Sequence, residues 1–488
     1  MKQPHDQNNI ILKFLPGITS IICMCSFFYM LFTASTSKRI FSSPDYNWII
    51  KTGEWIYKNH GIPHTNILGT NFPQIEHINY VVYQWLFKLV VYFDYKLLGV
   101  HGLIWLIISI LILSLSVIAV TLYKRKYTGM PEVAVAIIGI IPCLIMFEDL
   151  RPFIVTILLA SILNFILVYK EKNKVKWVLI PLLFVLWANI HLGFVFGIIW
   201  LFIEYLLTAI KNKSFKSMLP LLFTVAVTLI NPNGYKLYPY LMTLGSSKFM
   251  NNFIMELSPI NFHNKLLLVT VILGILTFAY TTQSKAIRPA ERIMWVITLT
   301  MSLFSIRHLC FLIIIFPVFF AEASRLYLSK YINLVINTEN YSKEKDNVIL
   351  WSLIAIVIGL IFTFNKSFAV PAQRKVLTTG FIKYLNQNPP TSLILTDEFI
   401  GSELLFYTKY RAFMDSRFDM YGDKYVQEYY ETLLPQAKNW KTLYIKKNIK
   451  YIARQNKDLI GTPNLKLLMS NGWKIAYQDK KIIYLIKK

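Results

Sequence analysis

The segment SSPDYNWIIKTGEWIYKNHGIPHTN, residues 42–66, follows the first long apolar run of the sequence and carries an aspartate, a glutamate and two histidines. Ser43 suits the N-cap of a helix, and Pro44 suits the first helical position, which places Asp45 in the first turn. Gly61, with a proline two positions later, is typical of a helix end. The segment is therefore predicted to form one helix whose first residue is Pro44.

The predicted helix is amphipathic, and a tryptophan-bearing helix of this kind lies in the interface plane of a membrane. One face is apolar and the other is polar, with Trp48, Ile49, Thr52, Trp55 and Ile56 on the first and Asn47, Lys51, Glu54 and Lys58 on the second. A second segment of the same kind runs from about residue 79 to residue 98. On this pattern alone Asp45 has a structural explanation, because the helix dipole favours a carboxylate in the first turn.

The composition of the whole chain indicates a polytopic α-helical membrane protein. Hydrophobic residues make up 55% of the 488 residues, 16% are charged, and the mean hydropathy is +0.46. Soluble domains average about a quarter charged residues. Many of the apolar residues fall in runs of about 17 to 25, which are long enough to cross the hydrocarbon core of a bilayer as helices.

The 51 Lys and Arg residues exceed the 26 Asp and Glu residues, which gives a formal net charge of +25. Many of the basic residues lie in short clusters between apolar runs, where membrane proteins keep positive charge on the cytoplasmic side. The charge therefore indicates topology and contact with membrane lipids, and no nucleic-acid partner. The four cysteines lie inside apolar runs without metal-type spacing, which indicates packing residues.

Eleven apolar runs are predicted to span the membrane, near residues 14–33, 102–123, 131–147, 152–169, 177–189, 192–210, 218–231, 266–282, 293–305, 309–324 and 349–365. Five basic clusters each follow an even number of these spans, at residues 124–126, 170–176, 211–216, 284–292 and 325–346. If all five are cytoplasmic, the N-terminus lies inside and the C-terminus outside. The first run also has features of a cleaved secretory signal, and either interpretation places residue 40 outside.

This topology brings most of the unusual polar residues near the membrane to the outer side. They are the loop 34–100, EDLRP at 148–152, NIH at 189–191, NPNGYKLY at 231–238 and IRH at 306–308. Ionisable groups at membrane depth cost free energy and are by default a functional-site hypothesis. Because these polar segments lie at one face of the membrane, we expect them to line one cavity. The alternative is that they are polar only because they lie at helix ends.

The composition changes after residue 365, which divides the chain into a transmembrane part, 1–365, and a C-terminal domain, 366–488. The second part alternates short apolar runs, namely TSLILT, YRAFMD, KYIAR and KIIYLIK, with amphipathic stretches such as 423–434. Short apolar runs between helical stretches predict strands, so we expect a small α/β domain on the extracytoplasmic side.

The order of several motifs carries a resemblance to a known group. PDYNWIIKTGEWIYKNHGIPHTN is followed along the chain by YQWLF, LRPFIVTILLA, LWANIHLGFVFG, NPNGYKLYPYLMTLGS, SIRHLCFLIIIFPVF and FMDSRFDMYGDKY. Over almost its whole length the sequence resembles bacterial multi-spanning proteins related to the GT-C class of glycosyltransferases. The resemblance implies an enzyme of the bacterial cytoplasmic membrane that takes a sugar from a polyprenyl-phosphate-linked donor and acts on the outer face.

The resemblance gives Asp45 the role of catalytic base, because GT-C enzymes typically keep an acidic residue in the first outer loop. A carboxylate at this place takes the proton of an acceptor hydroxyl as that hydroxyl attacks the anomeric carbon. The departing polyprenyl phosphate gains negative charge, which cationic groups stabilise. The candidates for binding the donor at suitable depth are Arg151, Arg307, His191 and His308.

One position departs from the pattern of the group, which has an acidic residue before a Trp-Leu pair where this chain has Gln84. Glu54, Glu76 and Asp149 are the candidates for a second acidic role. A divalent metal ion stays open, since no spacing of His and Asp residues forms a ligand set by itself.

The cationic candidates and the distal motif also have structural alternatives. In the structural alternative, His191 is a buried polar residue that forms a hydrogen bond with Asn189. Arg151 would then form an ion pair with Glu148 or Asp149 at the start of the next helix. In FMDSRFDMYG, the charged residues Asp415, Arg417 and Asp419 predict a salt bridge in a loop at a strand end, and they are also candidates for contact with the acceptor.

Three functions fit these features. The first is an inverting glycosyltransferase whose acceptor is an envelope glycan, lipid or protein. The second is a transporter or flippase of lipid-linked saccharides, although the repeated halves typical of transporters are not evident in the sequence. The third is a non-catalytic membrane protein of envelope assembly.

Overall fold

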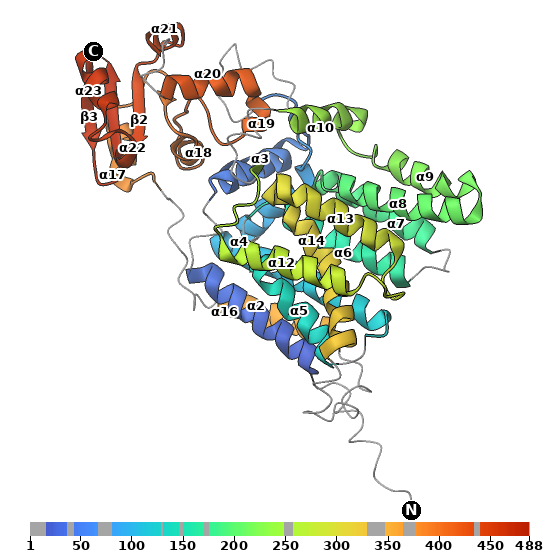
Figure 1. Cartoon of the computed structure of the whole chain (residues 1–488). Coiled ribbons are helices and arrows are strands. Elements are labelled where there is room, and N and C mark those ends of the chain that lie inside the picture. Colours follow the sequence, from blue (N-terminus) through green and yellow to red (C-terminus); the bar gives the residue numbers. More distant parts are fainter. Residues whose placement is uncertain are drawn as a thin grey trace, which may run out of the picture.

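The computed structural model describes residues 16–36, 43–66, 81–127, 130–145, 150–169, 175–247, 257–328, 347–364, 376–433 and 440–487. These residues form a bundle of helices with a smaller part of mixed α/β structure at the C-terminal end of the chain (Figure 1). The long helices of the bundle are α2 (Ile18–Thr36), α4 (Trp85–Lys124), α5 (Met130–Ile145), α6 (Phe153–Tyr169), α7 (Lys176–Ile190), α8 (Phe194–Asn212), α9 (Leu219–Val227), α12 (Lys265–Tyr280), α13 (Pro289–Phe304), α14 (Leu309–Ala323) and α16 (Val348–Phe364). Each of them lies over one of the predicted spans.

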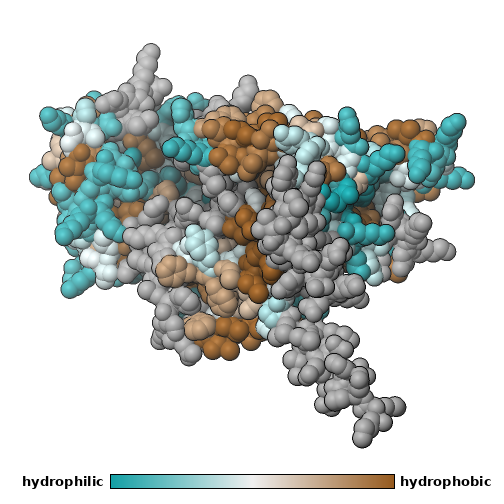
Figure 2. All heavy atoms as spheres, turned by 60° about the horizontal axis from the view of Figure 1, so that its bottom comes forward, coloured by the Kyte–Doolittle hydropathy of each residue, from teal (hydrophilic) through white to brown (hydrophobic). Residues whose placement is uncertain are grey.

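Three stretches of the described chain are long and apolar enough to cross a membrane, namely Trp85–Lys124, Phe194–Asn212 and Ile306–Tyr327. Other helices are shorter, and α9 covers only nine residues of the predicted span 218–231. Apolar side chains form patches on the bundle, and hydrophilic ones predominate at the left of Figure 2, where the C-terminal part lies. The chain is a multi-pass membrane protein, while the number and direction of its crossings stay predictions.

Helix α14 forms the centre of the bundle. Its residues from Leu309 to Glu322 are all buried, as expected for a helix that is apolar on every side. It packs against α5, α6, α12 and α13. Shorter elements complete this part of the chain: η1 (Phe215–Met218), η2 (Gly234–Lys236), α10 (Leu237–Ser246), η4 (Ile306–His308) and η5 (Ser324–Leu328).

Helix α4 combines two predicted elements in one kinked helix. Gly99 has φ 65° and ψ −146°, and it separates an N-terminal part that begins at Trp85 from the long apolar part. Glycine adopts positive φ without the steric penalty of a side chain. The kink explains why the sequence shows an amphipathic stretch to residue 98 and a separate apolar run from residue 102.

Helix α3 (Asp45–Asn59) begins one residue later than predicted, and a different residue ends it. Pro44 is the N-cap residue, and the Ser43 hydroxyl accepts a hydrogen bond from the Asp45 backbone N–H at 3.3 Å. At the other end His60, rather than Gly61, adopts the left-handed conformation, with φ 49°.

Helix α3 has two neighbours. The helix packs against α4 and against α18 (Glu398–Tyr407) of the C-terminal part. Contact with α18 includes the Tyr46 and Tyr407 hydroxyl groups, which lie 3.4 Å apart. Asn47, which the sequence assigns to the polar face, is fully buried. The prediction of an exposed polar face is therefore wrong at Asn47, because a distant part of the chain covers that face.

Gly53 allows α3 to approach α4 closely. A Cβ atom added at Gly53 would lie 2.7 Å from Cβ of Tyr92 and closer still to the carbonyl oxygen of Lys88. Since neither neighbour can move without shifting α4, Gly53→Ala is expected to destabilise the protein by about 1–3 kcal/mol, measured as a lower melting temperature in detergent. Gly61→Ala is the matched control, because its Cβ would meet only the Asn59 carbonyl oxygen, at 3.6 Å. Equal losses in both variants would contradict this explanation.

The C-terminal part contains a four-stranded sheet in the order β1-β2-β4-β3. β1 pairs with β2 in parallel, and the other two pairs are antiparallel. The strands are β1 (Ile394–Leu395), β2 (Tyr451–Gln455), β3 (Trp473–Gln478) and β4 (Ile482–Lys487). Besides α18, the helices of this part are α17 (Thr379–Gln387), α19 (Phe418–Tyr421), α20 (Asp423–Leu433), α21 (Trp440–Lys446), α22 (Asn456–Leu459) and α23 (Pro463–Ser470).

The apolar run YRAFMD does not form the predicted strand. It makes a single parallel bridge, between Ala412 and Ile394. The Ile394 backbone N–H donates to the Arg411 carbonyl oxygen, and the Phe413 N–H donates to the Ile394 carbonyl oxygen, both at 3.1 Å. After Phe413 the chain leaves the edge of the sheet and reaches α3, where Ser416 contacts the first residue of that helix.

Candidate active site

Three of the predicted polar segments meet at one end of the bundle. Trp85, at the start of α4, donates its indole N–H to the side-chain oxygen of Asn189 at 2.7 Å. The Asn189 amide donates to the Ile230 carbonyl oxygen at 2.8 Å, and the Asn233 amide donates to the Val82 carbonyl oxygen at 3.4 Å. These contacts join the start of α4 to the end of α7 and to the turn after α9.

Asp45, the candidate base, is the first residue of α3. Its Oδ1 atom accepts hydrogen bonds from the Ser416 hydroxyl at 2.6 Å and from the Trp48 indole N–H at 3.1 Å. Its Oδ2 atom forms an ion pair with the Arg151 guanidinium at 3.2 Å. The side chains of Asp45 and Arg151 are each 18% exposed. The carboxylate is thus held by elements far apart in the sequence and still reaches the surface.

Arg151 lies just before α6 and contacts Asp45 directly. Its Nη2 atom also donates to the Ser43 hydroxyl at 3.0 Å, and that hydroxyl accepts the Asp45 backbone N–H. The three residues therefore close a ring of contacts that fixes the direction of the guanidinium. A guanidinium with a fixed direction suits the recognition of phosphate and carboxylate groups. Glu148 and Asp149, the partners considered from the sequence, lie outside the described residues.

His191, which follows α7, bonds Thr156 and not Asn189. Its Nδ1 atom lies 2.8 Å from the Thr156 hydroxyl and accepts the Gly193 backbone N–H at 3.1 Å. Because a backbone amide donates to Nδ1, a neutral His191 ring carries its proton on Nε2. The ring therefore has an N–H donor on the side that faces away from Thr156.

Arg307 and His308 lie in η4, directly before α14. Arg307 is close enough to His191 and His308 to act on both rings electrostatically. His308 stays against its own turn, with Nδ1 3.3 Å from the Met301 carbonyl oxygen and its ring beside that of Phe311. His191 and Thr156, with Arg307 within electrostatic range, form a second group of polar side chains.

The start of α6 connects this group to Asp45. Arg151, which contacts Asp45, and Thr156, which contacts His191, are five residues apart, or roughly 8 Å along a helix axis. The structure therefore places Asp45, Arg151, His191 and Arg307 at the same end of the bundle.

Glu54 lies away from this end of α3. It is nine residues after Asp45, or about 13 Å along the helix axis. There it pairs with Lys51 at 3.1 Å and with Lys58 at 2.7 Å, and the hydrogen bond from Lys58 holds the pKa of the Glu54 carboxyl below its usual value. Glu76 and Asp149, the other acidic candidates, lie outside the described residues. Within the described ranges no three His, Cys, Asp or Glu side chains gather as a metal site.

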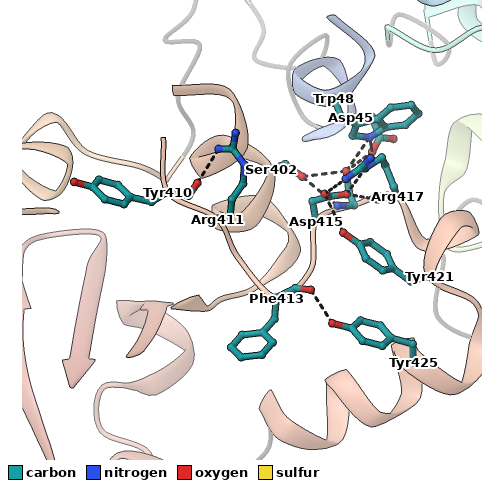
Figure 3. A network of polar contacts seen from close by, with 11 residues as sticks. Asp45, Trp48, Ser402, Tyr410, Arg411, Phe413, Asp415, Arg417, Tyr421 and Tyr425 are labelled. Carbon is teal, nitrogen blue, oxygen red and sulfur yellow. Dashed lines mark hydrogen bonds and ion pairs between the residues drawn. The ribbon is translucent and has the colours of Figure 1, made fainter. Parts of the chain in front are cut away.

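Sequence reasoning missed Ser416, which contacts Asp45 from the C-terminal part. Its neighbours Asp415 and Arg417 form the predicted salt bridge, with Arg417 Nη2 and Nε 2.6 Å and 2.8 Å from the two carboxylate oxygens (Figure 3). Asp419 instead accepts a hydrogen bond from the Tyr240 hydroxyl at 2.8 Å. The sequence shows Ser416 between two residues of opposite charge, which marks the motif as unusual. It does not show that this motif contacts α3.

A second polar network lies at the opposite ends of the same helices. Arg125, just after α4, pairs with Glu291 near the start of α13. Arg288 pairs with Glu204 of α8 at 2.8 Å and with Glu291 at 3.0 Å. Glu291 is 1% exposed, so its two guanidinium partners compensate a buried charge. This network joins α4, α8 and α13 as a structural contact.

Comparison with known proteins gives a likeness in fold. No family model matches the chain, and no curated protein is similar to it in sequence. The structure of ArnT from Cupriavidus metallidurans bound to undecaprenyl phosphate is 12% identical, with a TM-score of 0.49 over 98% of both chains. The archaeal oligosaccharyltransferase AglB from Archaeoglobus fulgidus, in complex with an inhibitory peptide and a dolichol-phosphate, is 10% identical, with a TM-score of 0.56 over 90% of this chain and 69% of that chain. The likeness to AglB therefore shows a shared fold.

Proposed function

We propose that this chain is an inverting glycosyltransferase that moves a sugar from a polyprenyl-phosphate-linked donor to a hydroxyl group of an envelope glycan, lipid or protein. The observation that carries the proposal is the partly exposed Asp45 carboxylate, 3.2 Å from the Arg151 guanidinium in a GT-C-like fold. AglB, which shares the fold, was solved with a dolichol-phosphate and a peptide. The proposed site faces the outer side of the bacterial cytoplasmic membrane, where the C-terminal part also lies and helps to position the acceptor.

In the proposed reaction Asp45 is the base. The acceptor hydroxyl gives its proton to the carboxylate while the hydroxyl oxygen forms a bond to the anomeric carbon of the sugar. The bond between that carbon and the phosphate oxygen breaks, and the polyprenyl phosphate leaves with the electron pair. A single displacement of this kind inverts the configuration at the anomeric carbon.

The donor phosphate is assigned to Arg151, Arg307 and the His191 ring. Negative charge grows on the leaving phosphate in the transition state, and preorganised cationic donors stabilise it most there. Arg151 also contacts Asp45, so it places the base beside the leaving group. His308 is assigned a supporting role, because it precedes α14 in the same turn as Arg307.

Arg151→Gln is expected to lower kcat/KM for the lipid-linked donor by about a hundredfold, because a preorganised donor to the developing charge is lost. Arg151→Lys keeps the charge without the forked geometry and should lose less. The measurement is label transferred from polyprenyl-phosphate sugars in membranes that supply the natural acceptors. Arg292→Gln is the control, since Arg292 bonds backbone carbonyl groups at the other end of the bundle. Wild-type kinetics in Arg151→Gln would show that Arg151 does not bind the donor phosphate.

Transport of lipid-linked saccharides is a second candidate, favoured by the charged network around Glu291 at the other end of the bundle. Ionisable groups in membrane segments can line a transport path. Proteoliposomes with the lipid-linked saccharide in one leaflet distinguish the two functions. A transferase with acceptor breaks the bond between sugar and phosphate, whereas a transporter moves the intact lipid to the other leaflet.

The third function, a non-catalytic role in envelope assembly, needs no polar site. The contact of Asp45 with Arg151 supports a chemical site instead.

A further inference from the structure

The C-terminal part reaches Asp45 through the hydroxyl of Ser416. This hydroxyl donates to Asp45 Oδ1 at 2.6 Å and accepts hydrogen bonds from the Trp48 indole N–H at 3.1 Å and the Ser402 hydroxyl at 3.2 Å. One donor and two acceptor positions are all that a hydroxyl has, so its hydrogen-bonding capacity is fully used. Ser416 therefore lies at a junction between α3, α18 and its own loop.

The loop that carries Ser416 is fixed on both sides. Asp415 and Arg417 form an ion pair (Figure 3). The Arg417 side chain has no exposed surface. The Tyr421 hydroxyl also donates to Asp415, at 3.1 Å. The Ser416 backbone N–H donates to the Ser402 hydroxyl at 3.1 Å. Because these contacts fix the loop, the Ser416 hydroxyl can hold the Asp45 carboxylate in one position.

The contacts of Asp45 distinguish its two oxygen atoms. Oδ1 accepts from Ser416 and from Trp48, whose N–H is shared with the Ser416 hydroxyl, and two bonds fill the acceptor positions of one carboxylate oxygen. Among the described residues Oδ2 contacts only the Arg151 guanidinium, which leaves an acceptor position on that atom. Oδ1 is thus the atom by which the carboxylate is held, and Oδ2 is the atom that can take a proton.

We propose that Ser416 is a positioning residue for Asp45, so that the C-terminal part completes the active site. This inference rests on the proposed function. By holding Oδ1, Ser416 directs Oδ2 toward Arg151 and the acceptor hydroxyl. Without Ser416 the carboxylate is held on that side by Trp48 alone, and a displacement of about 1 Å in a catalytic group can lower a rate about a hundredfold.

Ser416→Ala in the full-length protein tests the inference. With a panel of radiolabelled polyprenyl-phosphate hexoses and pentoses, kcat for the donor that wild type consumes should fall at least about tenfold, while KM for that donor changes less than about twofold. Ser416→Thr keeps the hydroxyl and should restore most of kcat, which a purely structural role does not predict. Ser470→Ala, at an exposed position of α23, is the matched control and should keep the wild-type rate.

The possible results separate the inference from the proposed function. A wild-type kcat in Ser416→Ala, together with an inactive Asp45→Asn, overturns the positioning role and leaves the transferase in place. A faster Ser416→Ala variant also overturns it, because Ser416 would then occupy the place of the acceptor hydroxyl. Failure of the wild-type protein to transfer any sugar of the panel overturns both proposals.

Discussion

Replacing Asp45 with asparagine is expected to abolish sugar transfer while the protein stays folded in the membrane. The amide has nearly the shape of the carboxylate, but it cannot take the proton of the acceptor hydroxyl. A positioned base contributes about 10²–10⁴-fold to a rate, so activity should fall at least about a hundredfold. Label transferred from polyprenyl-phosphate sugars, in membranes that contain the overproduced protein and natural acceptors, measures the loss.

Glu431→Gln is the matched control for this variant. It makes the same change from carboxylate to amide on α20, where Glu431 accepts a hydrogen bond from Gln427 at the surface. It should transfer sugar at the wild-type rate, and both variants should unfold at the wild-type temperature. Full activity in Asp45→Asn would show that Asp45 is not the base.

Arg417→Met is expected to have the largest effect on stability. The Arg417 side chain has no exposed surface, and its removal leaves the Asp415 carboxylate buried without its ion-pair partner. Breaking a buried pair in this way costs about 3–5 kcal/mol. Limited proteolysis of the reconstituted protein should therefore cut residues 376–487 much faster than in wild type, while the bundle stays protected.

The double variant Asp415→Asn, Arg417→Met tests whether the unpaired charge is the cause. It removes both charges, so much of the lost protease resistance should return. Equal sensitivity in the single and double variants would show that the loss comes from packing and not from charge. Wild-type resistance in Arg417→Met would contradict the role of the pair.

The helices of the bundle could be predicted because each is encoded by its own apolar run. The break between α7 and α8 at His191 could be predicted from the basic clusters, whose placement on one side of the membrane requires two spans between residues 177 and 210. The length of α9 could not be predicted, since apolar residues continue beyond Val227 while the helix does not. An apolar run predicts that a segment is buried or in contact with lipid. It does not predict the residue at which the helix ends.

The surroundings of α3 depend on contacts between distant parts of the chain. Its periodicity predicts one exposed face, yet Lys51 on that face contacts the ring of Phe406 in α18, and Asn47 is fully buried. The same limit applies to YRAFMD, which has the composition of a strand but follows the sheet edge only at Ala412. Local pattern cannot show which surface a later segment will cover.

The sequence predicts which residues belong to the candidate site better than it predicts the contacts they make. The places of Asp45 and Arg151 along the chain predict that both belong to the site, and the structure brings them to 3.2 Å from each other. Glu54 was chosen as an acidic residue near Asp45, but helix geometry carries it away along α3 to pair with Lys51 and Lys58.

The most direct test of the proposed function is the position of a polyprenyl phosphate bound to the reconstituted protein, determined by cryo-electron microscopy. The phosphate is expected at the end of the bundle that carries Asp45, in contact with the guanidinium groups of Arg151 and Arg307. A phosphate bound instead beside Arg288, at the opposite end, would contradict the proposed transferase site.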